Sequence, residues 1–131
     1  LGNKTLGVAI SDELGFLARP LKTIRFQDKD FNDAKEQLLI LLTEHKVTQL
    51  ILGLPKHMDG STGEQGQMAL AFKSMLEEDT DIPITLWDER LTSKMASNMM
   101  KQQSLSKAKR KESIDAMAAV VILQGYLDRQ S

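Results

Sequence analysis

The segment Leu50-Ile-Leu-Gly-Leu54 is an uninterrupted apolar run, and Pro55 closes it. A strand with one solvated face alternates polar and apolar residues, whereas a strand covered on both faces is apolar throughout. The pattern over residues 47–54 therefore predicts a buried, central strand. Such a strand requires helices on both sides of its sheet, so this run alone favours an α/β fold.

The flanking segments alternate between strand and helix patterns. A β-hairpin is predicted first, because two β-branched segments flank turn residues at 12–15. Later strands, separated by helices, are expected to run parallel, which gives a mixed sheet. The expected elements are strands over residues 6–11, 20–26, 47–54 and 81–87, helices over about 30–45 and up to about 78, a helix from Thr92, a loop over 55–63, a connection over 104–112, and a last helix from about 113.

Composition fits one domain over residues 1–131 that can bury a core. The chain has 41% hydrophobic and 27% charged residues, with 17 Lys plus Arg against 18 Asp plus Glu. It has no cysteine, which excludes a disulfide scaffold, a zinc ribbon and a thiol nucleophile. No segment reaches the roughly 20 apolar residues of a membrane helix, and no signal-peptide pattern is visible. We therefore expect a cytoplasmic protein without a membrane partner.

The motif Trp87-Asp-Glu-Arg-Leu-Thr92 lies where a predicted strand ends and a helix begins. Sites in open α/β sheets form at the carboxyl ends of strands. Asp88 and Glu89 could bind a hard cation such as Mg²⁺, and Arg90 could orient a phosphate. The alternative is that both carboxylates only solvate the loop and interact with the helix dipole.

Asp115 is the second candidate, placed in the first turn of the last predicted helix beside its apolar face. A carboxylate there is costly to bury without a partner or a metal. The alternative is equally simple, because an acid in the first turn of a helix is favourable without any function.

A third candidate is the segment 101–111, which carries five basic residues and no acid before position 112. Such a segment could follow a phosphate backbone, although a solvated loop is the other interpretation. The turn over residues 2–7 has glycines at both ends and could approach a phosphate or a metal-bound oxygen closely. The basic residues are Lys101, Lys107, Lys109, Arg110 and Lys111, and the turn contains Gly2, Asn3, Lys4 and Thr5.

Four sequence motifs, taken in order, resemble those of the YqgF family, which is also called RuvX. This is a family of pre-16S rRNA nucleases with the RNase H-like fold. The resemblance covers essentially the whole chain in register. The motifs are Gly2-Asn-Lys-Thr-Leu-Gly-Val-Ala-Ile-Ser-Asp12, Leu52-Gly-Leu-Pro-Lys-His-Met-Asp-Gly60, Asp88-Glu-Arg-Leu-Thr92 and Ile114-Asp-Ala-Met-Ala-Ala-Val-Val-Ile-Leu123.

The resemblance implies a mixed five-stranded sheet, in the order 3-2-1-4-5, with helices on both faces. It also implies a metal-dependent endonuclease acting on structured nucleic acid, with Mg²⁺ or Mn²⁺ in a two-metal mechanism. Glu89 and Asp115 match the family's catalytic and metal-binding acids, with Asp88 as a further metal ligand. Arg90 and Lys111 would contact phosphate, and the Asp59-Gly60 loop would border the groove.

The family's first catalytic Asp falls, in this resemblance, immediately before Leu1. We therefore expect the printed chain to lack the family's first strand and its carboxylate. That strand would lie centrally, between the hairpin and the strand over residues 47–54. Asp12 is not expected to replace the carboxylate, because it lies at the far end of the next strand.

Three functions are therefore compared. The first is processing of the pre-16S ribosomal RNA end, with a Holliday junction resolvase acting on branched DNA as its nearest alternative. The second is a ribosome-assembly factor that binds RNA through its basic segment without cleaving it. The third is a small nucleotide-phosphate domain, and either a monomer or a homodimer is compatible with all of them.

Overall fold

The computed structural model describes residues 1–91 and 107–130, with side chains placed for 1–91 and 116–130. The chain opens with the predicted hairpin, in which β1 (Thr5–Ser11) and β2 (Ala18–Arg25) pair antiparallel with a bulge between Val8 and Ala9. The Asp12 carboxylate accepts hydrogen bonds from the backbone N–H groups of Phe16 and Leu17, at 2.8 and 3.2 Å, and so shapes the connecting turn.

The strands β3 (Leu50–Leu54) and β4 (Ile84–Asp88) form a parallel pair, as the alternation of strands and helices predicts. Among the described residues β3 pairs with β4 alone, and only Leu52 and Leu54 of β3 are buried, so the central strand covered on both faces is not seen. Both strands begin three residues later than expected from the sequence. Pro83 has no N–H group and cannot pair in a ladder, although its carbonyl accepts a 2.9 Å hydrogen bond from Leu50 N. The register places Leu54 beside Asp88, so both carboxyl ends lie at one edge.

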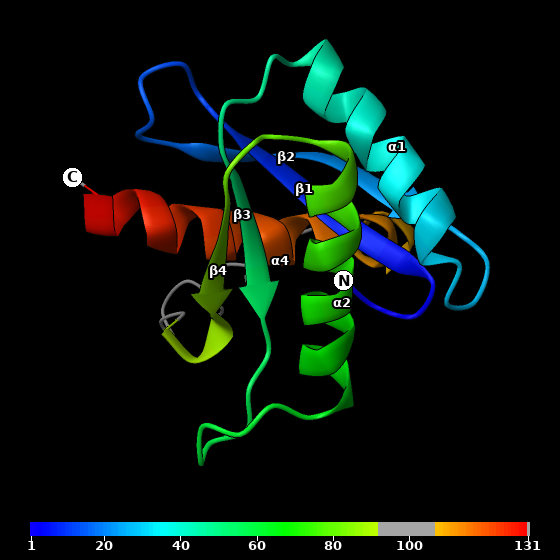
Figure 1. Ribbon diagram of the computed structural model, residues 1–131. Coiled ribbons are helices and arrows are strands. Elements are labelled where there is room, and N and C mark those ends of the chain that lie inside the picture. Colours follow the sequence, from blue (N-terminus) through cyan, green and yellow to red (C-terminus); the bar gives the residue numbers. More distant parts are fainter. Residues whose placement is uncertain (92–106, 131) are drawn as a thin grey trace.

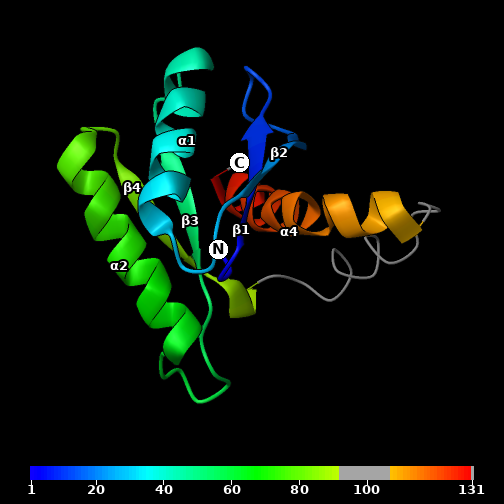
Figure 2. The ribbon, with the colours of Figure 1, turned by 90° about the vertical axis from the view of Figure 1, so that its right-hand side faces the viewer.

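Helices cover both faces of the strands (Figures 1 and 2). In Figure 2, α1 (Phe31–Glu44) and α2 (Glu64–Asp79) lie on one side and α4 (Lys107–Gln130) lies on the other. The Asp30 side chain caps α1 by accepting a hydrogen bond from Asp33 N, and α2 follows the 55–63 loop. The core between α1, α2 and the strands includes the fully buried Phe72, which contacts Phe31 edge to face.

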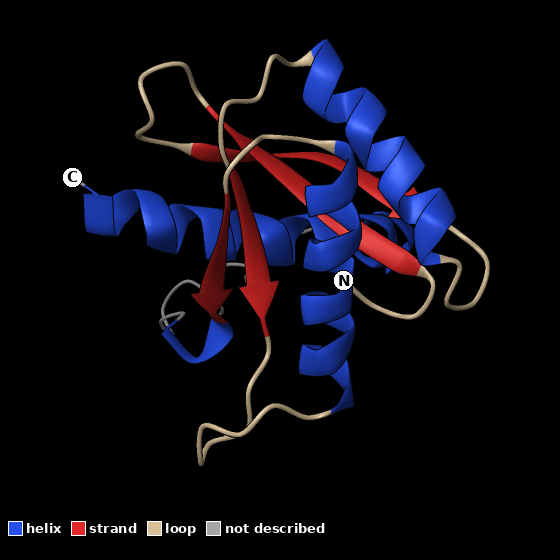
Figure 3. Cartoon of the chain, in the orientation of Figure 1, coloured by secondary structure: helices blue, strands red, loops and turns tan. Residues whose placement is uncertain are grey.

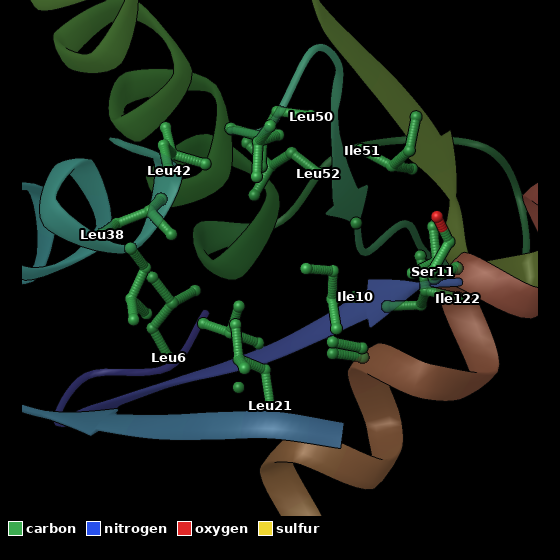
Figure 4. A pocket seen from close by; sticks show the side chains of 18 of the residues that line it. Leu6, Ile10, Ser11, Leu21, Leu38, Leu42, Leu50, Ile51, Leu52 and Ile122 are labelled. Carbon is green, nitrogen blue, oxygen red and sulfur yellow. The ribbon is translucent and has the colours of Figure 1, made fainter. Parts of the chain in front are cut away.

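The described residues form two separate two-stranded sheets, β1-β2 and β3-β4, rather than a single sheet (Figure 3). A groove of about 960 Å³ lies between β1 and β3. Its lining is largely apolar and comes from both strands and from α1, α2 and α4 (Figure 4). We call it the β1–β3 groove, and the single five-stranded sheet expected from the resemblance is not seen among the described residues.

The last helix begins earlier than the sequence pattern indicates. We expect a non-helical connection over 104–112, yet α4 begins at Lys107. Lys, Ala, Arg and Glu are strong helix formers, so the missing apolar periodicity shows only that this part has no apolar face. Asp115 therefore lies in the helix interior, not in the first turn. The helix expected to begin at Thr92 lies outside the described residues, and so does Lys101.

Within the described part of the chain, no helix combines the length and apolar character needed to cross a membrane.

Candidate active site

Glu89 lies at the carboxyl end of β4, where the strand passes into the short 3-10 helix η1 (Glu89–Leu91). Its side chain folds back over Gly53 of β3. A Cβ atom at position 53 would lie only 2.6 Å from Glu89 Oε1 and 2.8 Å from Ile122 Cδ1 of α4. Three elements therefore meet at a point that only glycine leaves open, and Glu89 and Gly53 both line the β1–β3 groove.

The Glu89 carboxyl is half-buried at this position. Burial raises its pKa above the ordinary value, and the adjacent Asp88 charge adds to the rise. A desolvated carboxylate is costly in its charged form, and a nearby cation offsets that cost. The environment of Glu89 therefore favours either a bound cation or a retained proton.

Asp88 lies directly before Glu89 but contacts a different partner. Both of its carboxylate oxygens accept hydrogen bonds from Arg90, with Oδ1 and Oδ2 each 3.1 Å from Nε and Oδ2 2.7 Å from Nη2. The Arg90 side-chain hydrogen bonds lower the pKa of Asp88 to about 2, and the same pairing raises the pKa of Arg90. Asp88 is consequently ionised over the whole physiological range.

The loop over residues 55–63 closes against the other side of Arg90. Arg90 Nη1 donates to the Met58 carbonyl at 3.4 Å. Gly60 has φ +91°, and a Cβ there would lie 3.5 Å from Arg90 Nη1. The Asp59 carboxylate accepts from the N–H and the hydroxyl of Ser61, which fixes the turn. The structure thus brings the predicted Asp59-Gly60 loop next to Arg90.

The predicted turn over residues 2–5 also contributes to the β1–β3 groove. Gly2 and Thr5 are among the residues that line it, as is Glu89. Gly2 N donates to Thr5 O at 2.8 Å, while the backbone oxygens of Asn3 and Lys4 accept from Lys29 and Phe26. A Cβ at Gly2 would meet only ordinary contacts, the nearest at 3.6 Å. The backbone of this turn is therefore held by the hairpin, and glycine is not sterically required at position 2.

Asp115 belongs to α4, two turns before Ile122. Helical periodicity places position 115 on the face of α4 that contains Ala118, Ala119 and Ile122, which line the groove. Lys107, Lys109, Arg110 and Lys111 occupy the first two turns of the same helix. Their side chains, like that of Asp115, lie outside the part described in atomic detail, so their roles remain predictions.

A metal site needs several ligands, and the described side chains do not supply enough of them. Among residues 1–91 and 116–130, no three His, Cys, Asp or Glu side chains lie close enough to hold one ion. Glu89 alone has the burial and orientation of a ligand, while the oxygens of Asp88 face Arg90. The described residues thus fit one part of a metal centre and not a complete one.

Two contributors to the site are not among the predicted site residues, namely Gly53 and Met58. Gly53 carried a usable signal, because a glycine inside an apolar strand often marks a close approach by another group. The Met58 contribution is a main-chain carbonyl, so its residue type carries no such signal.

Comparison with known proteins adds to this geometry. The model of the family described as "RuvX: Holliday junction resolvase" matches residues 1–129. The chain belongs to the RuvX family. A relative from Oceanobacillus iheyensis, named "Putative pre-16S rRNA nuclease", is 45% identical over 130 residues, which cover 99% of this chain and 95% of the relative.

Two further relatives carry the same name. The protein of Halalkalibacterium halodurans is 46% identical over 99% of this chain and 93% of its own length. The protein of Bacillus subtilis is 43% identical over 98% of this chain and 93% of its own length. The resemblance to this family, inferred from four sequence motifs, is therefore confirmed, and with it the RNase H-like, mixed α/β class of this RuvX-family chain.

The contact between Gly53 and Glu89 yields a prediction. Gly53→Ala should displace the Glu89 carboxylate while lowering the free energy of unfolding by no more than about 1–3 kcal/mol, because both atoms that crowd the new methyl group end flexible side chains. Urea unfolding gives the stability, and the pKa of Glu89, followed by NMR, should move toward the ordinary value. Gly2→Ala is the matched control, and an unchanged Glu89 pKa in Gly53→Ala would contradict the described packing.

Proposed function

We propose that this RuvX-family protein is a metal-dependent endonuclease that processes the end of pre-16S ribosomal RNA. The observation that carries the proposal is the half-buried Glu89 carboxylate, held over Gly53 at the carboxyl edge of the β3–β4 pair. The names of the relatives and of the family support nuclease chemistry on nucleic acid. Neither name specifies a metal.

We further propose that a fifth strand lies in the β1–β3 groove and completes a sheet in the order β2, β1, fifth strand, β3, β4. This is the order 3-2-1-4-5 that the resemblance implies. The groove supports it, because it is bounded by one strand from each pair and lined by apolar side chains such as Leu6, Leu50 and Leu52 (Figure 4). An added strand would supply partners for both inner edges, as buried backbone groups require.

In this proposal the metal is held by Glu89, Asp115 and a carboxylate of the fifth strand. Leu1 and Glu89 both line the groove, which is compatible with a first-strand Asp that enters it. Bound Mg²⁺ or Mn²⁺ would lower the pKa of the attacking water and stabilise the leaving oxygen. Glu89 contributes negative charge in a desolvated setting, where attraction to a cation is strong.

Binding of the substrate is assigned to the basic residues that flank the acids. Arg90 lies one residue after Glu89 and is exposed at the surface. Lys107, Lys109, Arg110 and Lys111 stand in the first two turns of α4, before Asp115 in the same helix. Contacts from such residues to phosphates release counterions, so binding should weaken steeply as salt is raised.

Branched DNA is the second candidate substrate, and the family's description as a Holliday junction resolvase favours it. The relatives' names favour RNA. A side-by-side assay of a ribosomal precursor RNA and a four-way DNA junction separates the two.

The nuclease proposal predicts cleavage of the precursor RNA in Mg²⁺ or Mn²⁺ by the protein expressed from its complete gene. Glu89→Gln and Asp115→Asn should each reduce kcat by at least about a hundredfold, since each removes an anionic ligand that would hold the metal. Glu77→Gln, on the exposed face of α2, is the matched control. Full activity in both site variants, or no metal dependence, would contradict the proposal.

The five-stranded sheet predicts a distinct pattern of amide hydrogen exchange in the same protein. Amides of β1 that point away from β2, and amides of β3 that point away from β4, should exchange as slowly as those inside the two pairs. NMR-detected exchange measures them individually. Rapid exchange of this set, at the rate of a free sheet edge, would show that no strand lies in the groove.

A further inference from the structure

The two adjacent carboxylates of the site face in different directions, and this separation suggests different roles. Glu89 turns over Gly53 toward the β1–β3 groove, whereas Asp88 faces Arg90 on the surface. We propose that Asp88 is a positioning residue that orients Arg90 for binding a substrate phosphate, rather than a ligand of the metal. The inference rests on the proposed function, because it assigns a role within the same site.

The hydrogen bonds of Asp88 leave little of its carboxylate for a cation. Oδ1 accepts from the backbone N–H of Arg90 at 3.0 Å and from Nε at 3.1 Å, and Oδ2 accepts from Nη2 at 2.7 Å. Asp88 therefore fixes both the main chain and the side chain of the residue two positions later. A cation at Asp88 would have to displace a guanidinium held by several charge-assisted bonds.

Arg90 keeps free hydrogen-bonding capacity at its outer end. A guanidinium has five N–H groups, and the edge formed by Nε and Nη2 faces Asp88. One Nη1 N–H faces the Met58 carbonyl. Among the contacts of the described residues, this leaves one N–H on each terminal nitrogen. Two such donors match two oxygens of one phosphate group.

The 55–63 loop fixes the guanidinium from its second side. A Cβ at Gly60 would meet Arg90 Nη1 only at an ordinary contact distance of 3.5 Å, so it is the φ of +91° that favours glycine in this turn. Asp59 holds the turn by accepting from the N–H and hydroxyl of Ser61. Because two chain segments orient Arg90 before any substrate arrives, little side-chain entropy is left to lose when a phosphate binds.

The test is a double-mutant cycle on RNA binding, measured by fluorescence anisotropy with a labelled precursor RNA stem in EDTA. Asp88→Ala and Arg90→Ala should each weaken binding by about tenfold, the scale of a charge-assisted hydrogen-bonded contact. The double variant should be no weaker than Arg90→Ala alone, because Asp88 acts only through Arg90. Asp88→Asn, which keeps one acceptor oxygen, should fall between wild type and Asp88→Ala. Glu77→Gln controls for the loss of one negative charge.

Cleavage kinetics separate positioning from metal binding. In Asp88→Asn, KM for the RNA should rise by less than the roughly tenfold weakening expected for Asp88→Ala, whereas kcat and the Mn²⁺ concentration for half-maximal activity should stay near those of wild type. A raised Mn²⁺ requirement with an unchanged KM would overturn the inference and assign Asp88 to the metal. Thermal unfolding followed by circular dichroism confirms that each variant is folded.

The outcomes for this inference and for the nuclease proposal are distinct. If the effects of Asp88→Ala and Arg90→Ala on RNA binding are non-additive but no RNA is cleaved, the positioning role of Asp88 stands and the nuclease proposal is rejected. If RNA is cleaved but the effects of Asp88→Ala and Arg90→Ala on binding are fully additive, the nuclease proposal stands and only the positioning role of Asp88 is rejected. Unchanged RNA binding in Asp88→Ala, or no RNA binding by the wild type, would also overturn the inference.

Discussion

The close approach of Glu89 to the backbone of Gly53 is the contact on which the candidate site depends. The parallel register of β3 and β4 brings the two carboxyl ends to one edge, and the absent side chain at position 53 lets Glu89 fold back across β3. Ile122 of α4 approaches the same point, where a Cβ at position 53 would lie 2.8 Å from its Cδ1. Burial by these neighbours raises the pKa of Glu89, so the strand pairing sets the chemistry of the carboxyl.

The neighbouring Asp88 shows how one residue step changes the environment of a carboxyl. Asp88 ends β4 and pairs with Arg90, which lowers its pKa to about 2. Glu89 begins η1 and is half-buried there, and this burial raises its pKa. The two acids therefore differ in their contacts, since Asp88 pairs with Arg90 and Glu89 lies over Gly53, and we propose different tasks for them on that ground.

Much of the fold could be predicted from the sequence, because it depends on local patterns. The apolar run ending at Leu54 predicted a strand there, although not its single partner and partial burial, and the hairpin and the first two helices followed from turn residues and periodicity. The start of α4 was predicted wrongly, since helix propensity without an apolar face leaves no periodic signal. The packing of Glu89 on Gly53 and the Met58–Arg90 contact depend on long-range geometry, which no local pattern contains. Glu89, Asp115 and Arg90 were candidates from their places at a strand end and in the last helix, their roles in catalysis came from the resemblance, and those roles remain predictions.

The central claim is that Glu89 holds a divalent cation in the β1–β3 groove. Anomalous scattering from crystals of the protein expressed from its complete gene, grown with Mn²⁺, tests this claim most directly. The account predicts an anomalous peak in direct contact with the Glu89 carboxylate, with Asp88 still paired to Arg90. A Mn²⁺ ion bound at Asp88, or peaks that all lie away from Glu89, would contradict it.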